Sequence, residues 1–305
     1  MPMKTAKQVY YFLVYTNILI ATAAAAQCAL TYLLFDAPFN YFIIVAEGSA
    51  TLLLYNFSLL LSKPKEPQQS KYRRTRWVFH NEWLLYMNSA LALIALLYAV
   101  CHIHVYSILL LVGIGLVSIS YSLPVLPYKG KWIGLRQVAG VKVFHIALVW
   151  TLSSVCLPVF ALHLDGVVIN GHIFGILAIA KFIFLLICTL PFDIRDIQQD
   201  SYYHLKTIPN IIGADKAILL CYGLLGLHSI IVLLSAIPSP IQIGLLTTNL
   251  LIALVLRQVV FRNVDRYHYA FLLDFALIAQ FVIVYLSVAS ADIPEVGDFF
   301  LFITS

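Results

Sequence analysis

The chain has 305 residues, of which 62% are hydrophobic and only 11% are charged, and its mean hydropathy is +0.92. Because soluble domains carry about 25% charged residues, this composition excludes an ordinary soluble enzyme, and its hydrophobicity also excludes a disordered chain. The formal net charge of +5 is small, and the soluble basic face that a nucleic-acid-binding protein needs is absent.

Long apolar runs divide the chain into membrane spans. A helix of about 20 apolar residues crosses a bilayer, and helices are required because lipid offers no partners to free backbone groups. The third and fourth runs are separated only by His102, Ile103 and His104, which predicts a tight hairpin; no third metal ligand lies near its two histidines. We predict one all-α membrane domain over residues 1–305, a bundle of nine transmembrane helices at about 9–35, 39–61, 83–101, 105–121, 138–160, 172–192, 216–236, 241–261 and 270–289.

The charged residues support this division. With nine spans the loops alternate sides, and all but two of the 19 Lys and Arg residues lie on the side of the N-terminus; the exceptions, Lys142 and Lys181, lie inside spans. The positive-inside rule then places the N-terminus in the cytoplasm and the C-terminus outside. We therefore expect a protein integral to the inner (plasma) membrane, and the first run, 9–35, is too long for a cleavable signal peptide.

The longest polar stretch, residues 62–82, joins the second and third spans and contains Arg73, Arg74 and Arg76. Two explanations stay open for these arginines. A basic loop sets the orientation of a membrane protein and lies well against an anionic leaflet. Guanidinium groups also bind phosphate oxygens through paired hydrogen bonds.

The most informative segment begins where the sixth span ends. Asp193, Asp196 and Asp200 have the spacing i, i+3, i+7, which places them on one face of a continuous helix. Three neighbouring carboxylates repel each other unless a cation lies among them, and Mg²⁺ prefers carboxylates together with substrate phosphates. The alternative is a solvated acidic helix end. The position at a membrane boundary favours a metal-bridged diphosphate site for a lipid whose tail lies in the bilayer.

These aspartates, followed by Lys206-Thr207 and Gly213, resemble the second aspartate-rich motif of the UbiA superfamily of intramembrane prenyltransferases. A second segment, Tyr121-Ser122 with Lys129 and Lys131 after it, is similar to the Tyr-Ser and lysine segment of that family. The resemblance implies that Asp193, Asp196 and Asp200 hold Mg²⁺. It also implies that cationic side chains contact the diphosphate, namely Arg73, Arg74, Arg76, Lys129, Lys131, Arg195 and Lys206.

The chain departs from the family at the end of its second span. The family's first motif reads Asn-Asp-x-x-Asp-x-x-x-Asp. The matching segment here begins at Tyr55-Asn56, with Phe57, Leu60 and Pro64 at the three aspartate positions. Asn56 remains as a substrate-binding candidate, and every carboxylate of the motif is missing. Half of the metal cluster would then be replaced by Asn56 or by cations, or catalysis would be lost and lipid binding retained.

Ionisable residues inside spans are costly and are functional candidates. Glu47 and Lys181 lie near mid-depth, and they are either a buried ion pair or groups facing a central cavity. Lys142 and Asp274 lie just inside their spans, and a structural pair or a snorkelling lysine explains them. His145 follows Lys142 by three residues and is a further candidate for lining the cavity.

The resemblance implies transfer of a prenyl group from a prenyl diphosphate to a lipophilic acceptor, an aromatic compound or quinone precursor, with Mg²⁺ as cofactor. Two alternatives stay open. One is a catalytically silent relative that binds an isoprenoid lipid, and the other is a small multispan transporter. Prenyl chain length, the acceptor and the oligomeric state do not follow from the sequence.

Overall fold

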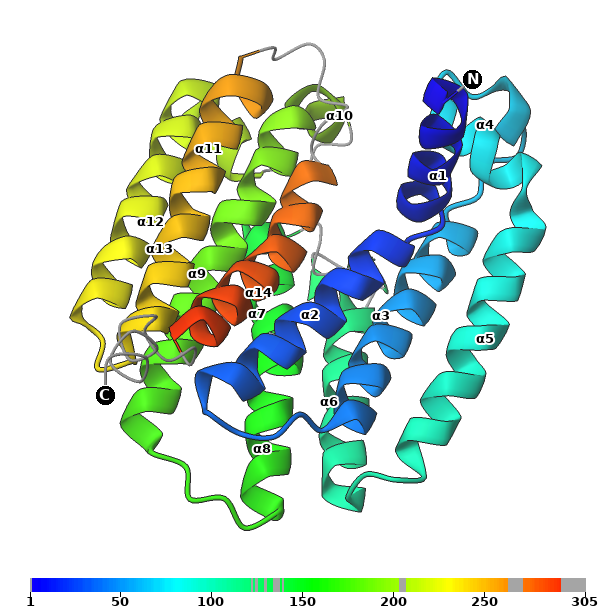
Figure 1. Ribbon diagram of the computed structural model, residues 1–305. Helices are drawn as coiled ribbons and strands as arrows, with labels where there is room; N and C mark the ends of the chain where they lie inside the picture. Colours follow the sequence, from blue (N-terminus) through cyan, green and yellow to red (C-terminus); the bar gives the residue numbers. More distant parts are fainter. Residues whose placement is uncertain are drawn as a thin grey trace, which may run out of the picture.

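The computed structural model describes residues 2–121, 123, 126–128, 131–133, 138, 140–202, 207–262 and 271–291. Long helices run side by side through the molecule and form a bundle (Figure 1). The predicted all-α membrane fold is therefore confirmed. The described strands are a short antiparallel pair, β1 (Leu126–Tyr128) and β2 (Lys131–Ile133), in which Tyr128 faces Lys131.

The first half of the chain supplies the helices on one side of the bundle. In chain order they are α1 (Pro2–Tyr15), α2 (Ile18–Leu34), α3 (Tyr41–Leu61), the 3₁₀ turn η1 (Pro67–Gln69), α4 (Arg73–His80), α5 (Glu82–Val100) and α6 (Val105–Ser120).

The second half supplies the other side. Its elements are α7 (Val141–Thr151), the π-helical turn η3 (Leu152–Cys156), α8 (Leu157–Leu164), α9 (Gly171–Arg195), α10 (Ile197–Tyr202), α11 (Ile208–Ile212), α12 (Ala214–Leu234), α13 (Ser239–Val255), the π-helical turn η4 (Leu256–Val260) and α14 (Phe271–Ala291).

Seven helices of the described chain are long and apolar enough to cross a membrane, and they match seven of the predicted spans. The remaining two predictions correspond to a bent pair and a short helix. The first span is divided into α1 and α2, and the fourth is the 16-residue helix α6. The count of nine spans stays a prediction, because α6 is shorter than the usual span of about 20 residues.

The first span is not the continuous helix that its apolar run predicts. The segment Gln8–Tyr15 meets Ile18–Leu34 at an angle of 64°. At the bend, Asn17 has φ +62°, a left-handed conformation that asparagine tolerates better than most side chains. The side chain of Asn17 is 4% exposed and bonds to residues of two other helices, so tertiary contacts hold the bend.

Small residues allow the central helices to approach closely. The alanine-rich helix α2 packs between α3 and α14 (Figure 1). Helix α13 packs against α14 at Gly244, where an added Cβ would lie 2.7 Å from the Cα of Val284. Such contacts are typical of helices in membranes, where packing rather than the hydrophobic effect drives association.

The outer surface of the bundle carries large apolar side chains. Leu91 and Ile94 on α5, Leu116 on α6 and Leu219 on α12 are each about 60–70% exposed. Such a surface is unfavourable in water and favourable in lipid. It supports the assignment of the chain as an integral membrane protein.

The two ends of the bundle differ. The short helices α1, α4, α10 and α11 gather at one end, and the tight connections α2–α3, α5–α6 and α8–α9 lie at the other (Figure 1). The aspartate segment that follows α9 therefore shares its end of the bundle with the arginines of α4.

Candidate functional site

The three predicted aspartates do not share one helix face, because the helix ends among them. Helix α9 ends at Arg195, Asp196 caps its C-terminus, and a new helix, α10, begins at Ile197. Asp193 therefore lies on the last turn of α9 and Asp200 on α10. Their side chains are only 3% and 8% exposed. The expectation of a single continuous helix was wrong here.

Lys142, on the first turn of α7, joins two of these carboxylates. Its Nζ lies 2.7 Å from Oδ1 of Asp193 and 3.3 Å from Oδ2 of Asp200. The second oxygen of Asp193, Oδ2, is buried and has no hydrogen-bond partner in the described chain. An ammonium group thus occupies the place between the carboxylates that the sequence assigned to a metal ion. The pair of Lys142 with Asp274, one of the two explanations that the sequence offered, is not formed in the described chain.

Asp196 has a different partner. Arg195 donates from Nε to Oδ1 of Asp196 at 2.7 Å and from an Nη to Oδ2 at 2.8 Å. This two-pronged pair engages both carboxylate oxygens, which is the strongest geometry for arginine and carboxylate. Arg195 also interacts electrostatically with Asp193 and Asp274.

The end of the second span presents an amide network in place of aspartates. Asn56 on α3 is fully buried, accepts a hydrogen bond from Nδ2 of Asn17 at 2.9 Å and donates to the hydroxyl of Ser89 at 3.0 Å. Asn17 in turn accepts a hydrogen bond from an Nη of Arg74 at 2.9 Å. Two buried asparagines therefore position one guanidinium group, which fits the substitution of carboxylates by a cation that the sequence suggested.

Arg74 is exposed, although much of the protein lies around it. Desolvation by the surrounding protein lowers the pKa of Arg74, and Asp274 on α14 opposes this shift. Arg74 and Arg195 also repel each other electrostatically. Arg195 is bound to Asp196, whereas Arg74 is bound to an amide, so the charge of Arg74 remains available to an anion.

The other two arginines of α4 do not join this site. Arg73 lies over the ring of Tyr11, 4.6 Å from its centroid, and Arg76 donates to the backbone oxygen of Ser70. Successive helix residues are turned by about 100°, so of the three only Arg74 faces the bundle. Among the remaining predicted cations, Lys129 and Lys206 lie outside the described residues, and Lys131 is described only through the backbone of β2.

These contacts define a charge cluster at one end of the bundle. Its acidic and basic members come from three longer helices, α7, α9 and α14, from the short helices α4 and α10, and from the residue that joins α9 to α10. The members are Asp193, Asp196, Asp200, Asp274, Lys142, Arg195 and Arg74.

A cavity of about 280 Å³ opens beside the charge cluster, between α3, α6 and α7. Tyr121 on its wall interacts electrostatically with Lys142, and Tyr55 does so with Arg74 and Asp274. Phe57 and Leu61, at its outer edge, are 56% and 62% exposed on the lipid-facing surface. We call this the lateral cavity; it is lined by Leu54, Tyr55, Phe57, Ser58, Leu61, Ser118, Ile119, Tyr121, Leu123, His145, Ile146, Val149 and Trp150.

His145 does line this cavity, as the sequence suggested. Its ring stacks on Tyr121 with centroids 5.3 Å apart, and its Nε2 is buried without a hydrogen-bond partner in the described chain. Tyr55 and Trp150 also line it. The lateral cavity is thus apolar and aromatic along its length and polar where it meets the charge cluster.

The mid-membrane residues Glu47 and Lys181 do not pair with each other in the described chain. Lys181 donates to Oε1 of Gln27, which itself donates to the backbone oxygen of Leu277 at 2.7 Å and to Oε1 of Gln280 at 3.2 Å. Glu47 is buried. The ion pair that the sequence offered as one explanation was wrong. The sequence analysis did not identify Gln27 as the partner of Lys181, because it considered only ionisable residues inside the spans.

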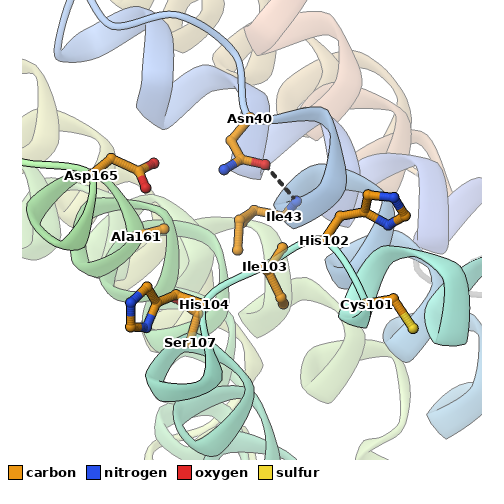
Figure 2. A pocket seen from close by; sticks show the side chains of 9 residues that line it. All are labelled: Asn40, Ile43, Cys101, His102, Ile103, His104, Ser107, Ala161 and Asp165. Atoms are coloured by element: carbon orange, nitrogen blue, oxygen red, sulfur yellow. Dashed lines mark hydrogen bonds between the residues drawn. The ribbon is translucent and has the colours of Figure 1, made fainter.

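A second cavity, of about 390 Å³, lies at the opposite end of the bundle (Figure 2). His102 and His104 lie on different sides of it, and each stacks on an aromatic ring, Phe42 and Tyr106 respectively. Among the described residues, no three His, Cys, Asp or Glu side chains are placed to hold one metal ion, either here or at the charge cluster.

The fold is that of UbiA homologues of known structure. A UbiA homolog from Archaeoglobus fulgidus bound to GPP and Mg²⁺ is similar with a TM-score of 0.61 and 12% identity, over 92% of this chain and 99% of that one. The same homolog bound to DMAPP and Mg²⁺ gives a TM-score of 0.60 and 12% identity, over 91% and 99% of the two chains.

A UbiA homolog from Aeropyrum pernix K1 in its apo form gives a TM-score of 0.61 and 15% identity, over 89% of this chain and 97% of that one. No protein-family model and no curated protein sequence matches the chain. The UbiA-like fold that the resemblance implied is therefore confirmed.

Proposed function

We propose that this chain is a membrane prenyltransferase that acts on a prenyl diphosphate and a lipophilic acceptor. The observation that carries this proposal is an apolar, aromatic cavity whose wall residues Tyr121 and Tyr55 interact electrostatically with the cations Lys142 and Arg74. A prenyl diphosphate has the same division into a charged head and an apolar tail. The binding of GPP and DMAPP by UbiA homologues with this fold supports the proposal.

In this proposal the diphosphate binds in the charge cluster. The two guanidinium groups and the ammonium group bind its oxygens through charge-assisted hydrogen bonds. The apolar tail lies in the lateral cavity, whose outer edge at Phe57 and Leu61 is exposed on the lipid-facing surface. A substrate dissolved in the bilayer would then enter sideways without crossing water.

The transfer begins when the C–O bond between the prenyl carbon and the diphosphate breaks. The electron pair leaves with the diphosphate, and the cations stabilise the charge that develops there. The allylic carbocation that remains lies among the ring faces of Tyr55, Tyr121 and Trp150, which favour a cation. The acceptor forms a bond to that carbon, and its displaced proton passes to water or to a diphosphate oxygen.

Mg²⁺, predicted from the spacing of the aspartates, fits the side chains of this structure poorly. Arg195 engages both oxygens of Asp196, and Lys142 lies between Asp193 and Asp200. The first aspartate motif, which would complete the cluster, is replaced by Asn56 and its amide network. The cations of the chain itself therefore carry the charge stabilisation in this proposal.

The orientation follows the distribution of charge in the sequence. The charge cluster lies at the basic end of the bundle, so we propose that the diphosphate faces the cytoplasm. The N-terminus lies on the same side, and the C-terminus outside. A water-soluble precursor of the acceptor would then meet the prenyl lipid at the cytoplasmic surface of the inner membrane.

One observation favours a second candidate, a catalytically silent relative that binds an isoprenoid lipid. Lys142 and Arg195 already neutralise aspartates, so the site could bind a diphosphate stably without cleaving it. A transporter has less support. The mid-membrane Lys181 is hydrogen-bonded to Gln27, a neutral side chain, which is a structural contact and not a transport pathway.

The deciding experiment uses the purified full-length protein in lipid nanodiscs with geranylgeranyl diphosphate and a panel of aromatic acceptors. Release of diphosphate and formation of prenylated acceptor are both measured. We expect turnover, and we expect Asp193→Asn to reduce it by about a hundredfold, because this change disturbs the position of Lys142. Asp215→Asn, an exposed aspartate on the first turn of α12, is the matched control.

Each result has a distinct meaning. Product formation that falls in Asp193→Asn and not in Asp215→Asn supports the transferase. Binding of the prenyl diphosphate without release of diphosphate with any acceptor would identify the silent lipid-binding relative instead. Absence of binding would contradict both and would favour the transporter.

A further inference from the structure

We infer that Lys142 is a built-in cation that replaces a divalent metal ion, so that this chain binds prenyl diphosphate without Mg²⁺. The inference rests on the proposed function and adds to it the means by which the anion is recognised.

The first support is the geometry around Lys142. Its ammonium group reaches from α7 to two carboxylates on two other helices, at 2.7 Å from Asp193 and 3.3 Å from Asp200. The aspartate side chains are only 3% and 8% exposed, and that of the lysine is 20% exposed. A pair of buried carboxylates needs a compensating cation, and this chain supplies one from its own sequence.

The second support is competition for the same atoms. A divalent ion that bound between Asp193 and Asp200 would lie beside the ammonium group and would be repelled by it. The remaining carboxylate of the motif, Asp196, has both oxygens bound to Arg195 at 2.7 and 2.8 Å. A metal ion would therefore have to displace two intact ion pairs before it gained its ligands.

The third support is that the opposite side of the site is built in the same way. Arg74 is held by Asn17, and Asn17 is held by the fully buried Asn56. None of these residues carries a negative charge, so they offer a metal ion no charged ligand. They present instead a guanidinium group, which binds phosphate oxygens directly.

The fourth support is that Lys142 can reach a bound diphosphate. An ammonium group has three N–H donors, and the two aspartates use two of them. Lys142 also interacts electrostatically with Tyr121, which lines the lateral cavity. A third donor of Lys142 therefore remains for an oxygen of the diphosphate in the proposed complex.

The test measures binding of the non-ionisable analogue geranyl thiodiphosphate to the purified full-length protein in nanodiscs, in excess EDTA and in excess Mg²⁺. We expect the two dissociation constants of the wild-type protein to agree within about threefold, since no metal takes part. Lys142→Gln removes the charge and retains a polar side chain. We expect its affinity in EDTA to fall by about tenfold or more and to recover in Mg²⁺, because the freed carboxylates can bind the ion.

A second measurement uses the metal alone. Mn²⁺, followed by electron paramagnetic resonance, should show no tight site in the wild-type protein and a new site in Lys142→Gln. Lys63→Gln is the matched control: Lys63 forms an exposed pair with Glu82 at 2.6 Å, so its removal should change neither measurement. The wild-type comparison needs no variant, so a failure of Lys142→Gln to fold does not remove the test.

The outcomes separate this inference from the proposed function. Wild-type binding that is lost in EDTA and restored by Mg²⁺ would overturn the inference and leave the prenyltransferase proposal intact. Absence of binding in both EDTA and Mg²⁺ would overturn the proposed function itself. A tight Mn²⁺ site in the wild-type protein would also contradict the inference.

Discussion

At Asn56 the amide side chain does what a carboxylate cannot do. It accepts a hydrogen bond from Asn17 and donates one to Ser89, so both ends of the amide are used in a position that is fully buried. A carboxylate there would accept but not donate, and it would attract the guanidinium of Arg74 away from Asn17. The amide keeps Arg74 directed at the charge cluster and leaves its charge free for an anion.

We predict that Asn56→Ala weakens binding of geranyl thiodiphosphate by about tenfold, because Arg74 loses the support of Asn17. The dissociation constant in nanodiscs is the measurement. Asn88→Ala is the control, since Asn88 is also buried and lies one residue from Ser89, but its Nδ2 has no hydrogen-bond partner in the described chain. Equal loss in both variants would show that Asn56 acts only through packing.

At the scale of the helix, the limits of sequence-based prediction are visible in two places. Apolar runs located the long helices because their length and composition are set by the bilayer. The spacing of Asp193, Asp196 and Asp200 predicts one face only if the helix continues, and α9 ends at Arg195. The end of α9 and the bend at Asn17 depend on contacts with other helices, which a local pattern does not contain.

The contact between α13 and α14 shows how one residue controls the spacing of two helices. We predict that Gly244→Ala lowers the free energy of unfolding by about 1–3 kcal/mol, because its Cβ would lie 2.7 Å from the Cα of Val284 and would force the helices apart. Thermal unfolding in detergent measures this loss. Gly226→Ala on α12, where an added Cβ meets nothing within 4 Å, should be neutral or stabilising. A similar loss in both variants would contradict the packing argument.

At the scale of the whole molecule, the site combines residues that no local pattern connects. The sequence identified the aspartates, Asn56 and His145 as candidates. The structure places the aspartates in the charge cluster, Asn56 in the amide network that holds Arg74, and His145 on the wall of the lateral cavity. Partners across the bundle were harder to predict. A pair with Asp274 was one of two explanations for Lys142, which binds Asp193 and Asp200, and Lys181 was considered with Glu47 and binds Gln27. Depth in the membrane predicts which groups need partners, whereas the packing of helices decides which partners they meet.

In the proposed complex the charge cluster binds the diphosphate and the lateral cavity binds the prenyl tail, and the two can be tested separately. We predict that Val149→Phe, which places a ring in this cavity of about 280 Å³, weakens binding of geranyl thiodiphosphate by about tenfold. Binding of inorganic diphosphate should be unchanged, because the charge cluster is not altered. Leu148→Phe, at a position 45% exposed on the outer surface, is the matched control and should leave both constants unchanged. If Val149→Phe has no effect on the analogue, the prenyl tail lies elsewhere in the bundle; if it weakens diphosphate as well, the cavity and the charge cluster form one binding unit.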